Sequence, residues 1–133
     1  SSLVGSEMCI RDRTEPEADP VAEWLEACER LSAFATSSQL VLPGHKLPFT
    51  GLPLRMRQLI ENHHGALRRL ERHLETPATA ADCFQPLFLR EIRSGEYGLA
   101  LVEAMAHCLH LWHVNRATRE VTDDGAWIWR KRS

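Results

Sequence analysis

Apolar residues recur every three or four positions in three long stretches, which predicts three amphipathic helices. The first should begin at Asp19-Pro20, because Asp19 is a suitable N-cap and proline fits the first helical position, and continue to about Ala35. The second should extend from about Leu54 to Glu75. The third and most apolar should extend from about Glu96 to Val114, where Asn115 is a suitable helix terminator.

The segments between these helices carry shorter signals. The apolar triplet 40–42 is too short to be more than the end of a strand, and a three-residue strand does not stand alone in water. Thr79 with Asp82 three residues later is a helix-capping motif, so a short helix should open there, and Pro86 should kink or end it. Residues 20–53 therefore have the outline of half an α/β unit without its sheet.

The end of the chain predicts a β-hairpin, because Asp124-Gly125 is a turn signal between residues 116–121 and 126–130. Helices followed by a two-stranded ribbon give the outline of a winged helix-turn-helix. The expected fold class is mainly α with a small β-hairpin, in which a winged helix follows a truncated α/β remnant.

The first 13 residues, SSLVGSEMCIRDR, follow neither the helical nor the strand period. The string resembles translated sequencing-adapter read-through, so we expect residues 1–13 to be a disordered, non-native scar, with the true reading frame cut upstream. An ordinary disordered terminus is the alternative.

Composition sets broad limits on the class of protein. A chain of 133 residues suffices for one ordinary domain or two small ones, and a net charge of -2 gives no bulk electrostatic case for nucleic acid or membrane binding. No stretch approaches the roughly 18 to 20 apolar residues of a spanning helix, and no signal peptide is evident, so a cytoplasmic location is expected. The cysteines lack C-x-x-C spacing and are expected to be buried free thiols: Cys9, Cys28, Cys83 and Cys108.

One histidine stands where an α/β protein presents ligands. The run 40–42 breaks at Pro43-Gly44 and places His45 at the head of a loop that Pro48 and Gly51 punctuate. A lone histidine in such a place is more often structural than a ligand. His45 alone therefore does not define a site.

The order of motifs over more than a hundred residues resembles the end of metallo-β-lactamase-fold hydrolases, and most closely the glyoxalase-II-like ones with an added C-terminal winged helix. The resemblance covers about Pro20 to Arg132. It includes the run from Leu40 to His45, Pro48-Phe-Thr-Gly51, His63-His64, Thr79-Ala-Ala81 and Glu103-Ala-Met-Ala-His107.

The resemblance implies that His45 is a metal ligand. Its neutral imidazole would bind the second metal of a dinuclear zinc centre, whose bridging hydroxide attacks an ester, thioester or amide carbonyl. The family signature His-x-His-x-Asp-His does not occur in this chain. We therefore expect a fragment that lacks catalytic residues of its own, binds no cofactor by itself and is inactive, whereas the intact parent uses zinc.

If the chain is such a fragment, residues after the scar divide into three parts: a catalytic-domain remnant at 14–53, a connecting helix at 54–75 and a winged-helix domain at 76–133. The expected partner of the parent is a small acyl substrate, with a homodimer as an option and no membrane. The helix at 20–35 loses the sheet it would cover. We expect an apolar patch, self-association, or docking of this helix onto the connecting helix.

Three other histidines are candidates for a substrate or interface role: His63, His64 and His107. His63 and His64 are adjacent, so their side chains point about 100° apart and cannot easily chelate one ion. His107, His110 and His113 are spaced by three, so neighbours among them could share a metal. The plainer alternative is a polar edge beside a leucine-rich face.

The alternative function is nucleic-acid binding through the winged helix. The helix at 96–114 contains no Lys or Arg and carries Glu96 and Glu103, which argues against a base-reading helix. The cations available for this alternative are in or near the wing: Arg116, Arg119, Arg130, Lys131 and Arg132. Nucleic acid is therefore disfavoured, and a packing module that shapes the hydrolase cleft or a dimer contact is preferred.

Overall fold

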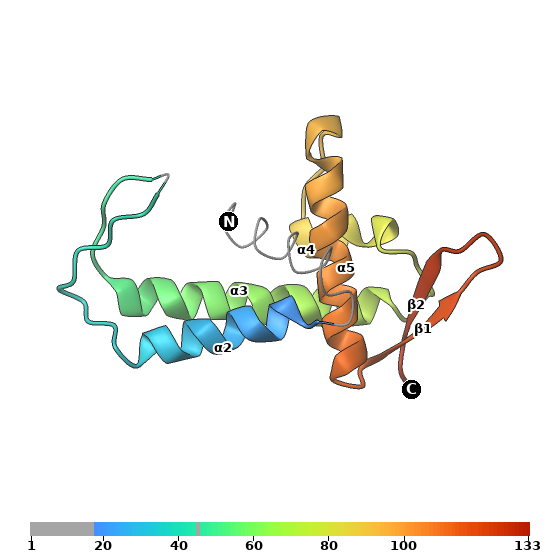
Figure 1. Ribbon diagram of the computed structural model, residues 1–133, viewed down its shortest axis with the longest axis horizontal. Coiled ribbons are helices and arrows are strands. Elements are labelled where there is room, and N and C mark those ends of the chain that lie inside the picture. The colour runs from blue at the N-terminus through green and yellow to red at the C-terminus, as the bar shows by residue number, and fades with distance from the viewer. Residues whose placement is uncertain (1–17, 45) are drawn as a thin grey trace.

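The computed structural model describes residues 18–44 and 46–133. The expected N-terminal scar and His45 lie outside the described residues. The elements, shown in Figure 1, are α2 (Pro20–Ser32), α3 (Leu52–His73), the 3-10 turn η1 (Ala81–Cys83), α4 (Phe84–Phe88), the 3-10 turn η2 (Ser94–Glu96), α5 (Tyr97–His113), β1 (Ala117–Val121) and β2 (Trp127–Lys131).

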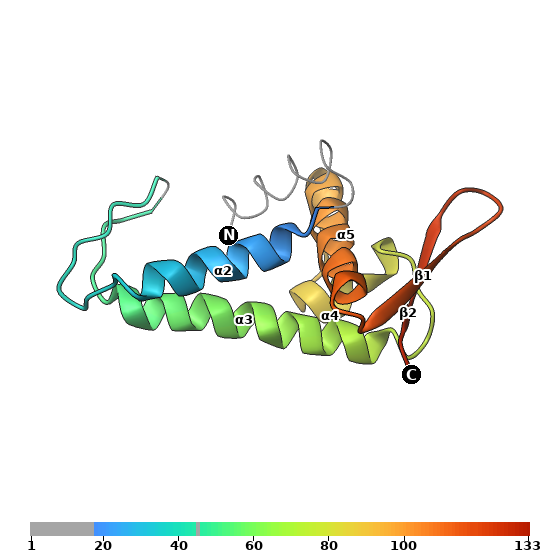
Figure 2. The same cartoon turned by 60° about the horizontal axis from the view of Figure 1, so that its bottom comes forward.

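Helices α2 and α3 lie side by side and run in opposite directions, and α5 crosses them near the start of α2 and the end of α3 (Figures 1 and 2). The hairpin β1–β2 lies beyond α5, and the loop between α2 and α3 lies at the opposite end of the molecule. One core joins these parts. Its fully buried members include Val21 of α2, Leu70 and Leu74 at the end of α3, and Trp129 of β2.

Local signals position the start of α2 and the approach to α4. The Asp19 carboxylate accepts a hydrogen bond from the backbone N–H of Ala22 at 3.0 Å, which confirms the expected N-cap. The backbone N–H of Asp82 donates to the Thr79 hydroxyl at 3.3 Å, as the capping motif predicts. Pro86 lies in the first turn of α4, where no helical hydrogen bond is lost, and the helix instead ends at Phe88, before the C-cap Leu89 at φ 55°.

Helix α5 ends as expected at Asn115, which adopts a left-handed conformation with φ 60°. The N–H of Arg116 donates to the Leu111 carbonyl at 2.7 Å, and that of Asn115 donates to the Trp112 carbonyl at 3.1 Å. These two bonds form a Schellman motif, which satisfies the last carbonyls of the helix. The chain then enters the hairpin, with Gly125 at φ 86° in its turn.

The hairpin register pairs Arg119 with Trp129 in an antiparallel sheet of two strands. A single bridge between Ala78 and Trp129 adds a third backbone segment beside β2. The predicted class, mainly α with a small β-hairpin, is confirmed, as are the buried free thiols at Cys28, Cys83 and Cys108. Cys9 lies outside the described residues.

The predicted strand end at 40–42 does not form as a strand. Val41 makes only one isolated antiparallel bridge, to Phe49. Among the described residues no strand lies beside this segment, so the bridge does not extend into a ladder. Helix α2 docks on α3 and α5, but its last turn still exposes 56% of Leu31, and Phe34 beyond it is 77% exposed. Both helix docking and an apolar patch, two of the expected outcomes, are therefore found together.

The Schellman motif provides a test of the fold. Asn115→Ala should lower the free energy of unfolding by about 1 to 2 kcal/mol, because an alanine Cβ is strained in the left-handed region. Asn115→Gly should leave stability unchanged or slightly raised. Urea unfolding followed by tryptophan fluorescence measures both variants, and equal stability of the two would contradict the assigned conformation.

Candidate functional site

The loop that carries His45 is closed by backbone hydrogen bonds at its base. The N–H of Val41 donates to the Phe49 carbonyl at 2.7 Å, and the N–H of Phe49 donates back at 3.1 Å. The N–H of Gly51, at φ 81°, also donates to the Ser37 carbonyl at 3.1 Å. The loop is thus anchored immediately before α3, although His45 itself lies outside the described residues.

Apolar side chains surround this loop without cover from the described residues. Leu42 is 74% exposed and Leu47 is 85% exposed, and Leu40 is exposed as well. Exposed apolar groups gathered on one segment are typical of a surface that packs against another part of a protein or against a partner. This loop, together with the exposed end of α2, forms the apolar end of the molecule.

Two of the candidate histidines meet inside the molecule. The rings of His63 on α3 and His107 on α5 stack with centroids 5.9 Å apart and planes 18° apart. The Nδ1 of His107 donates to the Glu103 carbonyl at 2.7 Å, and the Nδ1 of His63 donates to the Leu59 carbonyl at 3.0 Å. A carbonyl can only accept, so both Nδ1 atoms carry the proton in the neutral rings.

Burial keeps both rings neutral. Removal from water lowers the pKa of His107 from 6.5 to about 4, against the opposing effect of its hydrogen bond to the Glu103 carbonyl. Burial is also the main cause that lowers the pKa of His63. His107 was predicted either as an interface residue or as part of a polar edge. The polar edge is wrong for this residue, because His107 is buried where α5 packs on α3.

His110 holds the start of α2 against α5. Its Nδ1 lies 2.9 Å from one carboxylate oxygen of Asp19 and 3.1 Å from the other. Burial alone would raise the pKa of Asp19, but the hydrogen bonds from His110 and from the Ala22 N–H outweigh it and lower the pKa. Asp19 therefore caps one helix and pairs with another.

The remaining candidates do not assemble a metal site. His64 is half-buried, and the exposed His113 packs edge-on against Trp112 at 4.9 Å. His107 and His110 have different Nδ1 partners, Glu103 and Asp19. Within the described parts of the chain, no three His, Cys, Asp or Glu side chains come close enough to hold a metal ion.

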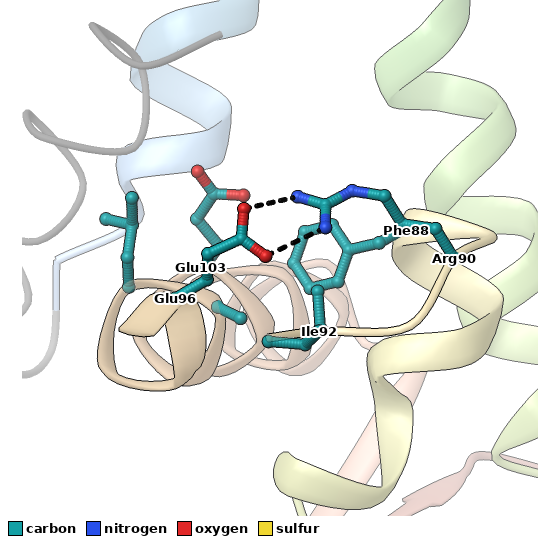
Figure 3. Close-up of a pocket in the computed structure, with 7 residues that line it drawn as sticks. Phe88, Arg90, Ile92, Glu96 and Glu103 are labelled. Carbon is teal, nitrogen blue, oxygen red and sulfur yellow. Dashed lines mark hydrogen bonds and ion pairs between the residues drawn. The ribbon is translucent and has the colours of Figure 1, made fainter. Parts of the chain in front are cut away.

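A hollow of about 360 Å³ lies between α4 and the first turns of α5 (Figure 3). Arg90 reaches across from the loop after α4 and forms a two-pronged ion pair with Glu96, at 2.9 and 3.3 Å. The carboxylate of Glu103 lies beside that of Glu96 in the same hollow (Figure 3). Burial raises the pKa of Glu103, and nearby Arg90 offsets this in part.

Two carboxylates against one guanidinium give this hollow an acidic rim. It suits a cation or a hydrogen-bond donor and repels phosphate. The sequence shows Glu96 and Glu103 as acidic residues of one helix, but nothing local indicates that Arg90 folds back onto them. The surface near the start of α5 is therefore acidic.

The cations proposed for nucleic-acid binding are largely engaged within the chain. Arg116 forms a bidentate pair with Glu71, and Lys131 pairs with Glu75 at 3.3 Å. The guanidinium of Arg119 lies over the rings of three tryptophans, at 3.9 Å from Trp112, 4.4 Å from Trp127 and 5.9 Å from Trp129. Arg130 and Arg132 are exposed.

Comparisons with known proteins identify the class to which this fold belongs. Residues 67–132 match the family model described as metallo-beta-lactamase-like, C-terminal domain. A solved β-lactamase domain protein from Burkholderia ambifaria is 35% identical, with a TM-score of 0.81, over 89% of this chain and 35% of that one. A metallo-beta-lactamase family protein from Thermus thermophilus shares the fold, with 23% identity and a TM-score of 0.70, over 86% of this chain and 34% of that one. A search of curated proteins found no match.

The chain belongs to the metallo-beta-lactamase superfamily, and its residues 67–132 belong to the C-terminal domain family of that group. The resemblance to metallo-β-lactamase-fold proteins that the sequence predicts is confirmed. The chain spans about a third of the length of the two solved relatives, 35% and 34%. No helix within residues 18–44 and 46–133 is both long and apolar enough to cross a membrane.

The buried histidine pair predicts that the protein loses stability in acid. The pKa of His107 is about 4 in the folded chain and 6.5 in the unfolded chain, so below 6.5 the unfolded chain takes up a proton first. The contribution of His107 to the free energy of unfolding should be complete above pH 6.5. It should fall progressively toward pH 4, by on the order of 3 kcal/mol. Urea unfolding measured across this range gives the slope.

Two variants separate His107 from other acid effects. His107→Gln should flatten the slope and leave a smaller remainder from His63, whereas the exposed His73→Gln should leave it unchanged. Equal slopes for the wild type and His107→Gln would show that the loss of stability arises elsewhere.

Proposed function

We propose that this chain is the C-terminal part of a metal-dependent hydrolase that cleaves ester or thioester carbonyls in its intact form. The observation that carries the proposal is the 35% identity, over 89% of the chain, to a β-lactamase domain protein of which the chain spans only 35%. The apolar end of the molecule supports it, because a missing catalytic part would cover those exposed leucines. A cytoplasmic location and a homodimer belong to the same proposal.

The donor set of this chain does not fit a dinuclear zinc centre. Such a centre needs several histidine and carboxylate ligands converging on two ions, and no cluster of three donors exists within the described residues. His45 is then one ligand whose companions must come from the rest of the parent. The chain by itself is proposed to be inactive.

The C-terminal half would act as a packing module. Residues 76–133 contribute α4, α5 and the hairpin, which we assign to a winged helix, and α3 holds this module against α2. The acidic hollow beside Glu96 and Glu103 and the stacking of Arg119 on tryptophan rings support packing over nucleic-acid binding. The module would then shape or stabilise the hydrolase.

The proposal is tested first on the chain alone and then in a whole enzyme. Calorimetric titration with zinc should show no tight, stoichiometric uptake by the chain. A chimera in which residues 18–133 replace the matching part of the Burkholderia protein should bind zinc and hydrolyse a model thioester. In that chimera His45→Ala should remove about one zinc per chain and lower the rate by roughly a hundredfold or more.

His73→Ala is the matched control, because His73 is an exposed histidine on α3. It should change neither zinc content nor rate. Tight stoichiometric zinc binding by the chain alone would overturn the incomplete site. Full zinc content and activity in the His45→Ala chimera would overturn the role of His45.

A further inference from the structure

A second hollow, of about 280 Å³, lies at the C-terminal end of α3, at the opposite end of this helix from the His45 loop. Four cations and one carboxylate line this basic hollow: Arg68, Arg72, Arg116, Lys131 and Glu71. They come from α3, from the turn after α5 and from β2. Elements distant in sequence thus place positive charge around one concavity.

The single carboxylate that lines the basic hollow, that of Glu71, is already paired with Arg116. Arg116 donates to the two carboxylate oxygens of Glu71 from Nε at 3.0 Å and from Nη2 at 2.9 Å. The Nζ of Lys131 lies 3.3 Å from the exposed Glu75 carboxylate, an ion pair in contact with water and therefore weak. The hollow consequently retains net positive charge.

Arg68 and Arg72 have no hydrogen-bonded or ionic partner among the described residues, and they stand four positions apart on α3. Like charges at this spacing repel and disfavour the helix. The helix dipole favours a cation in the last turn, which accounts for Arg72 but not for Arg68, one turn earlier. A repulsive pair of charges that no contact among the described residues offsets is typical of a functional surface.

We propose that the basic hollow binds the phosphate groups of a small ligand, with diphosphate as its minimal form. Guanidinium groups present forked donors that match phosphate oxygens, and several of them converge here. The size of the hollow suits a compact anion. A long polyanion would need cationic contacts beyond the residues that line this hollow.

Titration of the whole chain with sodium pyrophosphate at about 10 mM ionic strength tests the proposal, because screening is weak under these conditions. Arg72→Gln should weaken binding about tenfold, as expected for the loss of a charged hydrogen bond. Arg57→Gln removes an exposed arginine from the other end of the same helix and should leave the affinity unchanged.

A second pair of variants distinguishes a local site from overall charge. Glu71→Gln should tighten pyrophosphate binding several-fold, because it releases Arg116 from its carboxylate. Glu61→Gln makes the same change in net charge about 15 Å along the helix and should have little effect. Thermal unfolding of each variant confirms that the fold is retained.

Three outcomes would overturn the proposal. The first is no detectable heat of pyrophosphate binding, and the second is equal weakening by Arg72→Gln and Arg57→Gln. The third is tighter, Arg72-dependent binding to a random DNA duplex or to anionic phospholipid vesicles than to pyrophosphate, which would assign the surface to a macromolecule or a membrane. None of these readouts depends on zinc or hydrolysis, so failure here leaves the proposed hydrolase untouched.

Discussion

The rest of the structure depends on the burial of one apolar stripe at the end of α3. Leu70 and Leu74 are completely buried, and Leu67 beside them is nearly so. They belong to the core that also contains Trp129 of the hairpin and the inner face of α5. In the first half of α3, which lies beside α2 (Figure 1), only Met56 is buried. The C-terminal module is therefore built on α3, and the His45 loop is carried at the other end of the same helix.

Most of the fold could be predicted from the sequence because its signals are local. Asp19 before a proline, Thr79 three residues before Asp82, Asn115 after an apolar run and the Asp-Gly turn each determine the backbone within a few residues. The spacing of apolar residues every three or four positions predicted the helices between these signals. A strand at 40–42 could not be assessed in this way, because a strand exists only when another segment pairs with it.

The candidate sites were less predictable because their contacts join distant positions. Asp19 and His110 are 91 residues apart, and no pattern in the sequence relates them. The stacking of His63 on His107 follows from how α3 crosses α5, so spacing along either helix could not reveal it. The cations in the wing were recognised by type, but whether each pairs with Glu71, Glu75 or a tryptophan face depends on the packed structure.

The continuity of α3 limits how proteins of this kind can vary in length. Each residue inserted into or removed from the helix would move the loop by about 1.5 Å along the axis and rotate it by about 100° relative to the C-terminal module. A change of seven residues nearly restores the direction but displaces the loop by about 10 Å. Insertions and deletions in related sequences should therefore avoid this helix and gather instead in the exposed connection between α2 and α3.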